Sequence, residues 1–258
     1  MRVAAAQIDC VPGAVQLNVD AMVQQVEEAA REGCNLIVFP ELADVGYDLP
    51  LAAHHASDWQ SEPIARLRDA AQKQGVAVFV ALRQPGDDGV YNSAAAIDSD
   101  GDLVGRYRKL HLFSPPPADE PRFFARGNAR CTLDLNGWRC RVAICYDLRF
   151  PESFRDLAGD PADLLVVCSA WPAVRAPHWR TLLAARAIEN QAYVVAANRV
   201  GTDAGLMFAG GSLILSPTGD VLAEADDHSQ TLIHANVSRT TLRQARAAIP
   251  VHRDARPD

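Results

Sequence analysis

Residues 18–39 read NVDAMVQQVEEAAREGCNLIVF, and in this stretch a helix pattern passes directly into a strand pattern. Residues 18–31 are predicted to form an amphipathic helix, because their apolar side chains recur at helical spacing. These side chains are Met22, Val26, Ala29 and Ala30. Gly33 is suited to end the helix. Residues 35–39 form a short continuous apolar run, which is typical of a strand covered on both faces. The stretch therefore predicts an α/β fold.

The same alternation extends along the chain on both sides of this stretch. Helices are predicted over residues 61–74, which have Pro63 in the first turn and Gly75 at the end, and over residues 178–191. A further helix is expected to begin near Pro151, and Ser238 is expected to cap a last helix that stops at Pro250. Buried strands are predicted at residues 1–9, 76–80, 164–168 and 193–197.

Hairpin patterns interrupt this alternation. Residues 91–98 and 103–109 flank a short turn that contains Gly101, and residues 132–135 and 138–145 flank Asn136-Gly137, a strong hairpin signal. Residues 211–215, 221–224 and 231–235 are also predicted strands. Helical crossovers mixed with hairpins indicate two mixed sheets packed on each other, with helices on the outer faces. We expect one domain over residues 1–258. The Pro-rich stretch from His111 to Gly127 is predicted to be a functional loop.

Composition limits the classes of function. The chain has 258 residues, of which 48% are hydrophobic and 22% charged, as in globular proteins with a large core. Its net charge of −7 and the lack of a basic tract argue against nucleic acid or anionic membrane as a partner. No apolar run is long enough for a membrane span or a signal peptide. The six scattered cysteines form no CxxC pair, so we expect reduced thiols in a cytoplasmic protein.

Three reactive side chains follow predicted strands. Glu41 comes after residues 36–40, Lys109 after 103–108, and Cys145 after 141–144. In α/β proteins, ligands bind beyond the carboxyl ends of such strands. A thiol that attacks a carbonyl or nitrile carbon needs a base, and an ammonium can stabilise the resulting oxyanion. The residues alone leave another interpretation open, in which the cysteine is a buried core thiol and the charged residues are surface groups.

The flanking residues resemble the three signature segments of the nitrilase, or carbon–nitrogen hydrolase, superfamily, in that family's order. The segments are FPEL at 39–42, YRKLHLF at 107–113 and ICYDLRFP at 144–151, and the similarity continues through 185–194, 198–201 and 216–220. The resemblance implies a four-layer α-β-β-α sandwich whose subunits pair into a homodimer or a higher homo-oligomer. It also implies that Cys145 is the nucleophile, Glu41 the general base and acid, and Lys109 the oxyanion stabiliser.

Two supporting residues follow from the same resemblance. The backbone N–H of Tyr146 is expected to be the second oxyanion donor, and Glu120 to hold Lys109 and the substrate amide in place. The other interpretation of Glu120 is a solvated loop carboxylate. The chemistry requires neither a metal nor an organic cofactor. A metal site formed by His54, His55 and Asp58 is the alternative that the histidines leave open.

Residues 145–151 and 171–179 are similar to the ω-amidase branch, whose members hydrolyse monoamides of dicarboxylates such as 2-oxoglutaramate. We expect Arg149 or Arg175 to bind the far carboxylate, because a guanidinium can hold it through two hydrogen bonds. Trp171, Tyr47 and Phe113 are the expected walls of the pocket. Ordinary ion pairs and plain core packing are the other interpretations of these residues.

Two alternatives to an ω-amidase remain. The first is a related enzyme that acts on another small amide, an N-carbamoyl compound or a nitrile. The second is a catalytically silent binding or assembly module. Loss of Glu41, Lys109 or Cys145 would be the mark of such a module, and all three residues are present.

Overall fold

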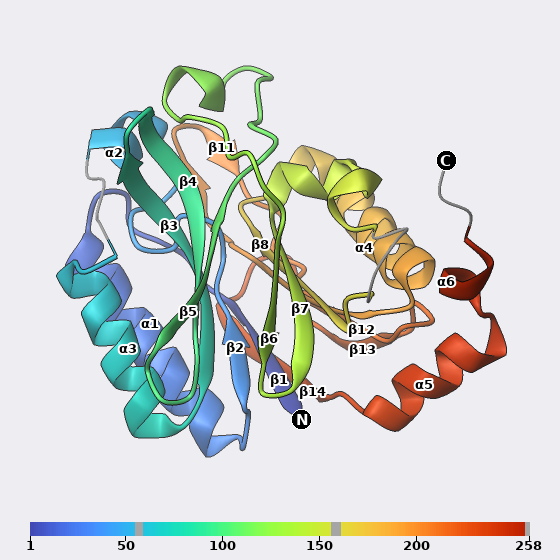
Figure 1. Cartoon of the computed structure of the whole chain (residues 1–258). Coiled ribbons are helices and arrows are strands. Elements are labelled where there is room, and N and C mark those ends of the chain that lie inside the picture. Colours follow the sequence, from blue (N-terminus) through green and yellow to red (C-terminus); the bar gives the residue numbers. More distant parts are fainter. Residues whose placement is uncertain (55–58, 156–160, 256–258) are drawn as a thin grey trace.

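The computed structural model describes residues 1–54, 59–155 and 161–255. It contains two six-stranded mixed sheets that lie face to face, with helices on their outer sides (Figure 1). The predicted α/β fold with two mixed sheets is therefore confirmed.

The first sheet has the order β14-β1-β2-β3-β4-β5. Its strands β1, β2 and β3 run parallel, and the other neighbours are antiparallel. In the order of the sheet, the strands span Thr231–Asn236, Arg2–Gln7, Leu36–Val38, Ala77–Gly86, Gly89–Ile97 and Leu103–Arg108.

The second sheet has the order β13-β12-β9-β8-β7-β6. Its strands span Val221–Glu224, Leu213–Leu215, Tyr193–Asn198, Leu164–Ser169, Trp138–Ile144 and Cys131–Leu135. From β6 to β13 the neighbours are antiparallel, parallel, parallel, antiparallel and antiparallel, which is the pattern of the first sheet from β14 to β5. The two sheets therefore share one pairing pattern. A separate hairpin joins β10 (Thr202–Asp203) to β11 (Leu206–Met207).

The central strands are buried on both faces, as their continuous apolar runs predict. In β1, Val3 and Ala5 belong to the core that includes the facing surfaces of the two sheets, whereas Ala4 and Ala6 belong to the core beneath the outer helices. Those helices are α1 (Val15–Arg31) and α3 (Glu62–Gln74), and α4 (Ala176–Asn190) packs on the second sheet. The layers follow the order α-β-β-α (Figure 1).

Local signals placed several element ends correctly. Gly33 and Gly75 have positive φ angles just after α1 and α3. Asn136 and Gly137 both have positive φ in the turn between β6 and β7, as a two-residue hairpin of this type requires. The Ser238 hydroxyl accepts the N–H of Thr240 and caps α5 (Arg239–Ala248).

Other local features differ from the sequence-based prediction. The helix expected near Pro151 is a single 3₁₀ turn, η3 (Pro151–Ser153), in the described part of this region. Helices α2 (Leu49–His54) and α6 (Val251–Asp254) and the β10–β11 hairpin were not predicted. All six cysteines are unpaired, in line with the expected reduced thiols. Among the helices of the described ranges, none has the length and apolar character that crossing a bilayer requires.

Candidate active site

The two sheets each carry part of the candidate site just beyond a strand end. Glu41 follows β2 and Lys109 directly follows β5, both in the first sheet, whereas Cys145 directly follows β7 in the second. Glu41 and Lys109 are fully buried, and the Cys145 side chain is 6% exposed. The site therefore lies where the ends of strands from both sheets meet.

Three donors surround the Glu41 carboxylate. The Asn92 amide donates to Oε1 at 2.7 Å, and Lys109 Nζ donates to the same oxygen at 2.6 Å. The backbone N–H of Ala170, which follows β8, donates to Oε2 at 3.0 Å. These contacts fix the carboxylate between the two sheets.

Glu120 holds the other side of Lys109. Lys109 Nζ donates to Glu120 Oε1 at 2.8 Å, and the Tyr47 hydroxyl donates to the same oxygen at 2.5 Å. The Phe113 N–H donates to Glu120 Oε2 at 2.8 Å. Glu120 begins the 3₁₀ helix η1 (Glu120–Arg122) and is fully buried. The solvated-carboxylate interpretation of Glu120 is therefore wrong.

Two donors of Lys109 are thus used by carboxylates. An ammonium has three N–H donors and no acceptor, so one donor remains for a third group. The nearby carboxylates of Glu120 and Glu41 outweigh the effect of burial and raise the pKa of Lys109, which keeps the side chain cationic.

Cys145 stands at a tight turn between strand and helix. It has a φ angle of +45° and begins the 3₁₀ helix η2 (Cys145–Arg149). Positive φ is uncommon for residues other than glycine and marks a backbone that its surroundings hold in place. The first N–H groups of a helix lack acceptors within the helix, and Tyr146 is in this first turn.

Asp147 is the residue that holds this turn. Its Oδ2 accepts the Ile144 N–H at 3.0 Å and the Tyr107 hydroxyl at 2.6 Å. Its Oδ1 accepts the backbone N–H of His111 at 2.9 Å and contacts His111 Nδ1 at 2.8 Å. Since Tyr107 is in β5 and His111 lies beyond its end, one buried carboxylate ties the Cys145 turn to the chain that carries Lys109.

The electrostatics of Cys145 keep its thiol protonated in the free protein. Burial raises the pKa of Cys145 well above its usual value, and the Glu41 carboxylate raises it further. Lys109 and the Ser169 hydroxyl act in the opposite direction without reversing the shift. A proton acceptor must therefore take the thiol proton when the sulfur reacts.

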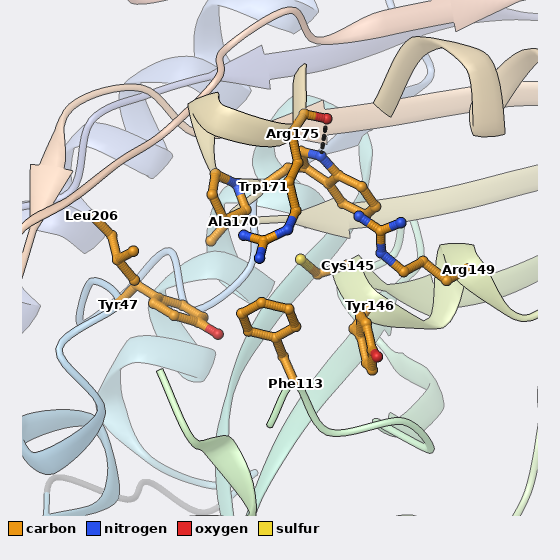
Figure 2. A pocket seen from close by; sticks show the side chains of 10 residues that line it. Tyr47, Phe113, Cys145, Tyr146, Arg149, Ala170, Trp171, Arg175 and Leu206 are labelled. Atoms are coloured by element: carbon orange, nitrogen blue, oxygen red, sulfur yellow. Dashed lines mark hydrogen bonds between the residues drawn. The ribbon is translucent and has the colours of Figure 1, made fainter. Parts of the chain in front are cut away.

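A small hollow opens over the sulfur (Figure 2). It contains about 330 Å³ of empty space, counting its open mouth. Its walls include five of the residues that the sequence placed at the pocket, namely Tyr47, Phe113, Arg149, Trp171 and Arg175, together with Tyr146. Glu41, Lys109 and Glu120 are fully buried and are not among the residues that line the hollow.

Arg149 and Arg175 both point into the hollow (Figure 2). The Arg149 guanidinium lies 4.7 Å from the Trp171 ring centre, and Arg175 lies 5.4 Å from that of Phe113. Within the described ranges, neither arginine has an ion pair with a carboxylate. Burial and the charge of Arg175 lower the pKa of Arg149, as expected for two cations that share one space.

Sequence reasoning missed several contributors. No local sequence pattern predicted the contacts made by Asn92, the Ala170 N–H and Asp147, because each contact joins segments far apart in the chain. Of the histidine cluster considered for a metal, His54 ends α2, whereas His55 and Asp58 lie outside the described residues.

Comparison with known proteins identifies the family. A family model described as carbon–nitrogen hydrolase matches residues 2–247. The chain belongs to the carbon–nitrogen hydrolase family. This hydrolase is 36% identical over 234 residues to the 2-oxoglutaramate amidase of Bacillus subtilis, covering 90% of this chain and 88% of that relative. It is 37% identical over 224 residues to the omega-amidase YafV of Escherichia coli K12, covering 86% of this chain and 85% of the relative.

Solved structures agree with this assignment. XC1258 from Xanthomonas campestris is a CN-hydrolase superfamily protein with an arsenic adduct in its active site. It superposes on this hydrolase with a TM-score of 0.93 at 30% identity, over 100% of this chain and 98% of the other. An amidase from Nesterenkonia sp. AN1, with acrylamide added to its active-site cysteine, gives a TM-score of 0.83 at 28% identity, over 97% and 98% of the two chains. The predicted superfamily is confirmed, and the protein is an amide-hydrolysing enzyme.

Proposed function

We propose that this hydrolase is an ω-amidase that converts a dicarboxylate monoamide, such as 2-oxoglutaramate, and water into the dicarboxylate and ammonia. The observation that carries this proposal is the pair of arginines, Arg149 and Arg175. They line the same small hollow as Cys145 without carboxylate partners in the described part of the chain. The names of the two amidase relatives, 2-oxoglutaramate amidase and omega-amidase, support the same substrate class.

In the first half of the proposed reaction, Cys145 becomes acylated. Its sulfur attacks the amide carbon while Glu41 takes the thiol proton. The oxyanion that forms accepts the remaining donor of Lys109 and the N–H of Tyr146, and the loss of one such donor typically reduces kcat by about 10²–10³-fold. Glu41 then passes its proton to the leaving nitrogen, so ammonia departs and a thioester remains.

In the second half, water releases the acid. Glu41 takes a proton from water, the hydroxide attacks the thioester carbon, and the Cys145 sulfur leaves and recovers the proton. One amide and one water give one carboxylic acid and one ammonia, and Glu41 ends as it began. Glu120 supports both halves because it fixes the Lys109 ammonium that faces each oxyanion.

The arginines provide the test of the substrate class. We expect Arg149→Met and Arg175→Met to raise KM for 2-oxoglutaramate by about 10–100-fold, since a charge-assisted hydrogen bond is worth about 1.5–3 kcal/mol. Hydrolysis of butyramide, which has no carboxylate, should change by less than about threefold. Ammonia release measures both substrates.

The matched control is Arg180→Met in α4, the helix that begins just after Arg175. Arg180 is exposed and pairs with Glu224 at the surface. The Arg180→Met variant should hydrolyse both substrates as wild type does. Equal loss on both substrates in the Arg149 and Arg175 variants, or wild-type preference for butyramide, would reject the ω-amidase proposal and favour a simple aliphatic amidase.

We further propose that residues 1–258 act as one domain that assembles into a homodimer or a higher homo-oligomer in the cytoplasm. The family match across residues 2–247 supports one domain, and the six unpaired cysteines suit a reducing compartment. The pairing of subunits rests on the resemblance to the family. Sedimentation over a range of protein concentrations tests it, and a monomer at every concentration would contradict it.

A further inference from the structure

A second, larger hollow adjoins the one over Cys145. It contains about 910 Å³ of empty space, counting its open mouth, and is bordered by residues 48–50 and by residues of the 116–123 segment. Tyr47 and Leu206 line both hollows. These two side chains therefore form the partition between the hollows.

Tyr47 is the fixed part of this partition. Its hydroxyl is bound to Glu120, its ring packs edge-on against Phe208 at a centroid distance of 5.8 Å, and it is only 4% exposed. Its backbone N–H donates to Asp203 Oδ2 at 2.7 Å. Moving Tyr47 would disturb the group that holds Lys109, so this side of the partition cannot open without affecting the reacting centre.

Leu206 is the replaceable part. It is half-buried in the short β11 strand, beyond the turn formed by Ala204 and Gly205. Both turn residues have positive φ angles, and the buried Asp203 anchors the base of the hairpin to Tyr47. The hairpin thus holds the Leu206 side chain beside Tyr47 (Figure 2). The apolar Leu206 side chain forms no hydrogen bond with any residue of the proposed reaction.

The position of the partition relates it to one end of the substrate. Figure 2 shows Arg149 on one side of the Cys145 sulfur, with Tyr47 and Leu206 on the other. In an amide, the acyl chain and the nitrogen lie on opposite sides of the carbonyl carbon. When Arg149 holds the acyl carboxylate, on the side of the sulfur away from Tyr47 and Leu206, the nitrogen faces the partition.

We propose that Leu206 restricts this enzyme to amides with an unsubstituted nitrogen, because it closes the space that an N-alkyl group would need. The larger hollow is then a latent site for the leaving amine. This inference rests on the proposed function only for the direction of the substrate. With Leu206 shortened, an N-alkyl amide and water give the acid and a primary amine, and Glu41 protonates that amine in place of ammonia.

The test compares Leu206→Ala with Met207→Ala. Met207 is the neighbouring residue of the same strand, is 65% exposed and lines neither hollow. For wild type and both variants, kcat/KM is measured for two unsubstituted amides, 2-oxoglutaramate and butyramide. It is also measured for the N-propyl derivative of each. Leu206→Ala should raise the ratio of N-propyl to unsubstituted amide at least about tenfold, and Met207→Ala should leave it unchanged.

A second measurement does not depend on turnover. The rate at which iodoacetamide alkylates Cys145 is compared with that of its N-propyl derivative by peptide mass spectrometry. Leu206→Ala should favour the N-propyl reagent relative to wild type, whereas Met207→Ala should not. This ratio decides the role of Leu206 even if neither amide is hydrolysed.

The outcomes separate the two proposals. Hydrolysis of butyramide but not of 2-oxoglutaramate rejects the proposed substrate, while the ratio on the butyramide pair still decides the role of Leu206. Unchanged ratios in Leu206→Ala, equal rises in both variants, or a wild-type enzyme that already accepts N-propyl amides would overturn the inference about Leu206.

Discussion

Burial governs the chemistry of the thiols in this protein. It raises the pKa of Cys10 and of Cys140 to about 12, and it also raises the pKa of Cys145. A shifted pKa therefore does not distinguish the proposed nucleophile from the core thiols. Its neighbours do, because among these three thiols Cys145 alone faces both Glu41 and Lys109.

The proximity of Glu41 gives a testable titration. Glu41→Gln removes a negative charge that raises the pKa of Cys145, so this pKa should fall in the variant. The thiolate of Cys145 is followed by ultraviolet difference titration of wild type against Cys145→Ala, and of Glu41→Gln against the double variant. Turnover should be lost although more thiolate is present at neutral pH, since the proton acceptor is missing. An unchanged titration midpoint would contradict the arrangement.

The position of Lys109 gives a second residue-scale prediction. Glu120→Gln removes one of the two carboxylates that hold the ammonium, and a displacement of about 1 Å near the reacting atoms can reduce kcat about 10²-fold. We expect a loss of that order in kcat with little change in KM. Asp119→Asn, at the exposed neighbouring carboxylate, is the control and should retain wild-type kcat. Equal effects of the two variants would argue against the role of Glu120.

The sequence predicted single residues well where a motif surrounds them. Glu41, Lys109 and Cys145 follow strands that periodicity alone indicates, and the structure brings them together; their catalytic roles stay predictions. Asp147 lies inside a quoted motif, but its function depends on Tyr107 and His111, which only folding brings near. Leu206 carried no signal, because a leucine in a short hairpin looks the same whether or not it lines a cavity.

At the scale of elements, the turn from β7 into η2 is the part on which the site depends most. Its first residue has positive φ, and the contacts of Asp147 hold it in that conformation. Backbone strain of this kind persists only where surrounding bonds maintain it. The geometry of Cys145 is therefore a property of β5, β7 and η2 together.

Asp147→Asn tests this dependence. The amide group cannot accept from all the donors that face the carboxylate, and each buried donor left without a partner costs about 1–3 kcal/mol. We expect the free energy of unfolding in urea to fall by about that amount, with a parallel loss of kcat. Asp134→Asn, at an exposed site in β6, should change neither. Full activity with reduced stability would show that the turn needs no such support.

Elements with local signals were predictable, and those that depend on distant contacts were not. The turn at Asn136-Gly137 and the ends of α3 follow from backbone preferences of a few residues. The helix expected at Pro151 fails because the segment from 145 onward is used for the Cys145 turn and its 3₁₀ continuation. The β10–β11 hairpin has two-residue strands, which are too short to show any periodicity.

At the scale of the whole molecule, Arg199 joins the two sheets near the site. It follows β9 of the second sheet, and its Nη2 lies 2.8 Å from Asp9 Oδ1, beyond β1 of the first sheet. It also pairs with the buried Asp203, which holds the Tyr47 N–H. The side chain of Arg199 is completely buried.

Arg199→Met should therefore be strongly destabilising. It leaves Asp203 as a buried charge without its cation, and breaking a buried pair in this way costs about 3–5 kcal/mol. Arg180→Met removes a cation from an exposed pair, for which the expected cost is about 0–1 kcal/mol. Urea denaturation of both variants measures the difference. Similar losses in the two variants would contradict the importance assigned to Arg199.

The division of the proposed reacting groups between the two sheets has a consequence for inactivation. The first sheet carries Glu41 and Lys109 and the second carries Cys145, so the alignment of these three side chains depends on how the two sheets pack together. A displacement of about 1 Å of one sheet relative to the other would leave the hydrogen bonds within each sheet intact but would misalign the proposed reacting groups. On warming, the enzyme should therefore lose its activity at a temperature at which its circular dichroism spectrum is still that of the native protein.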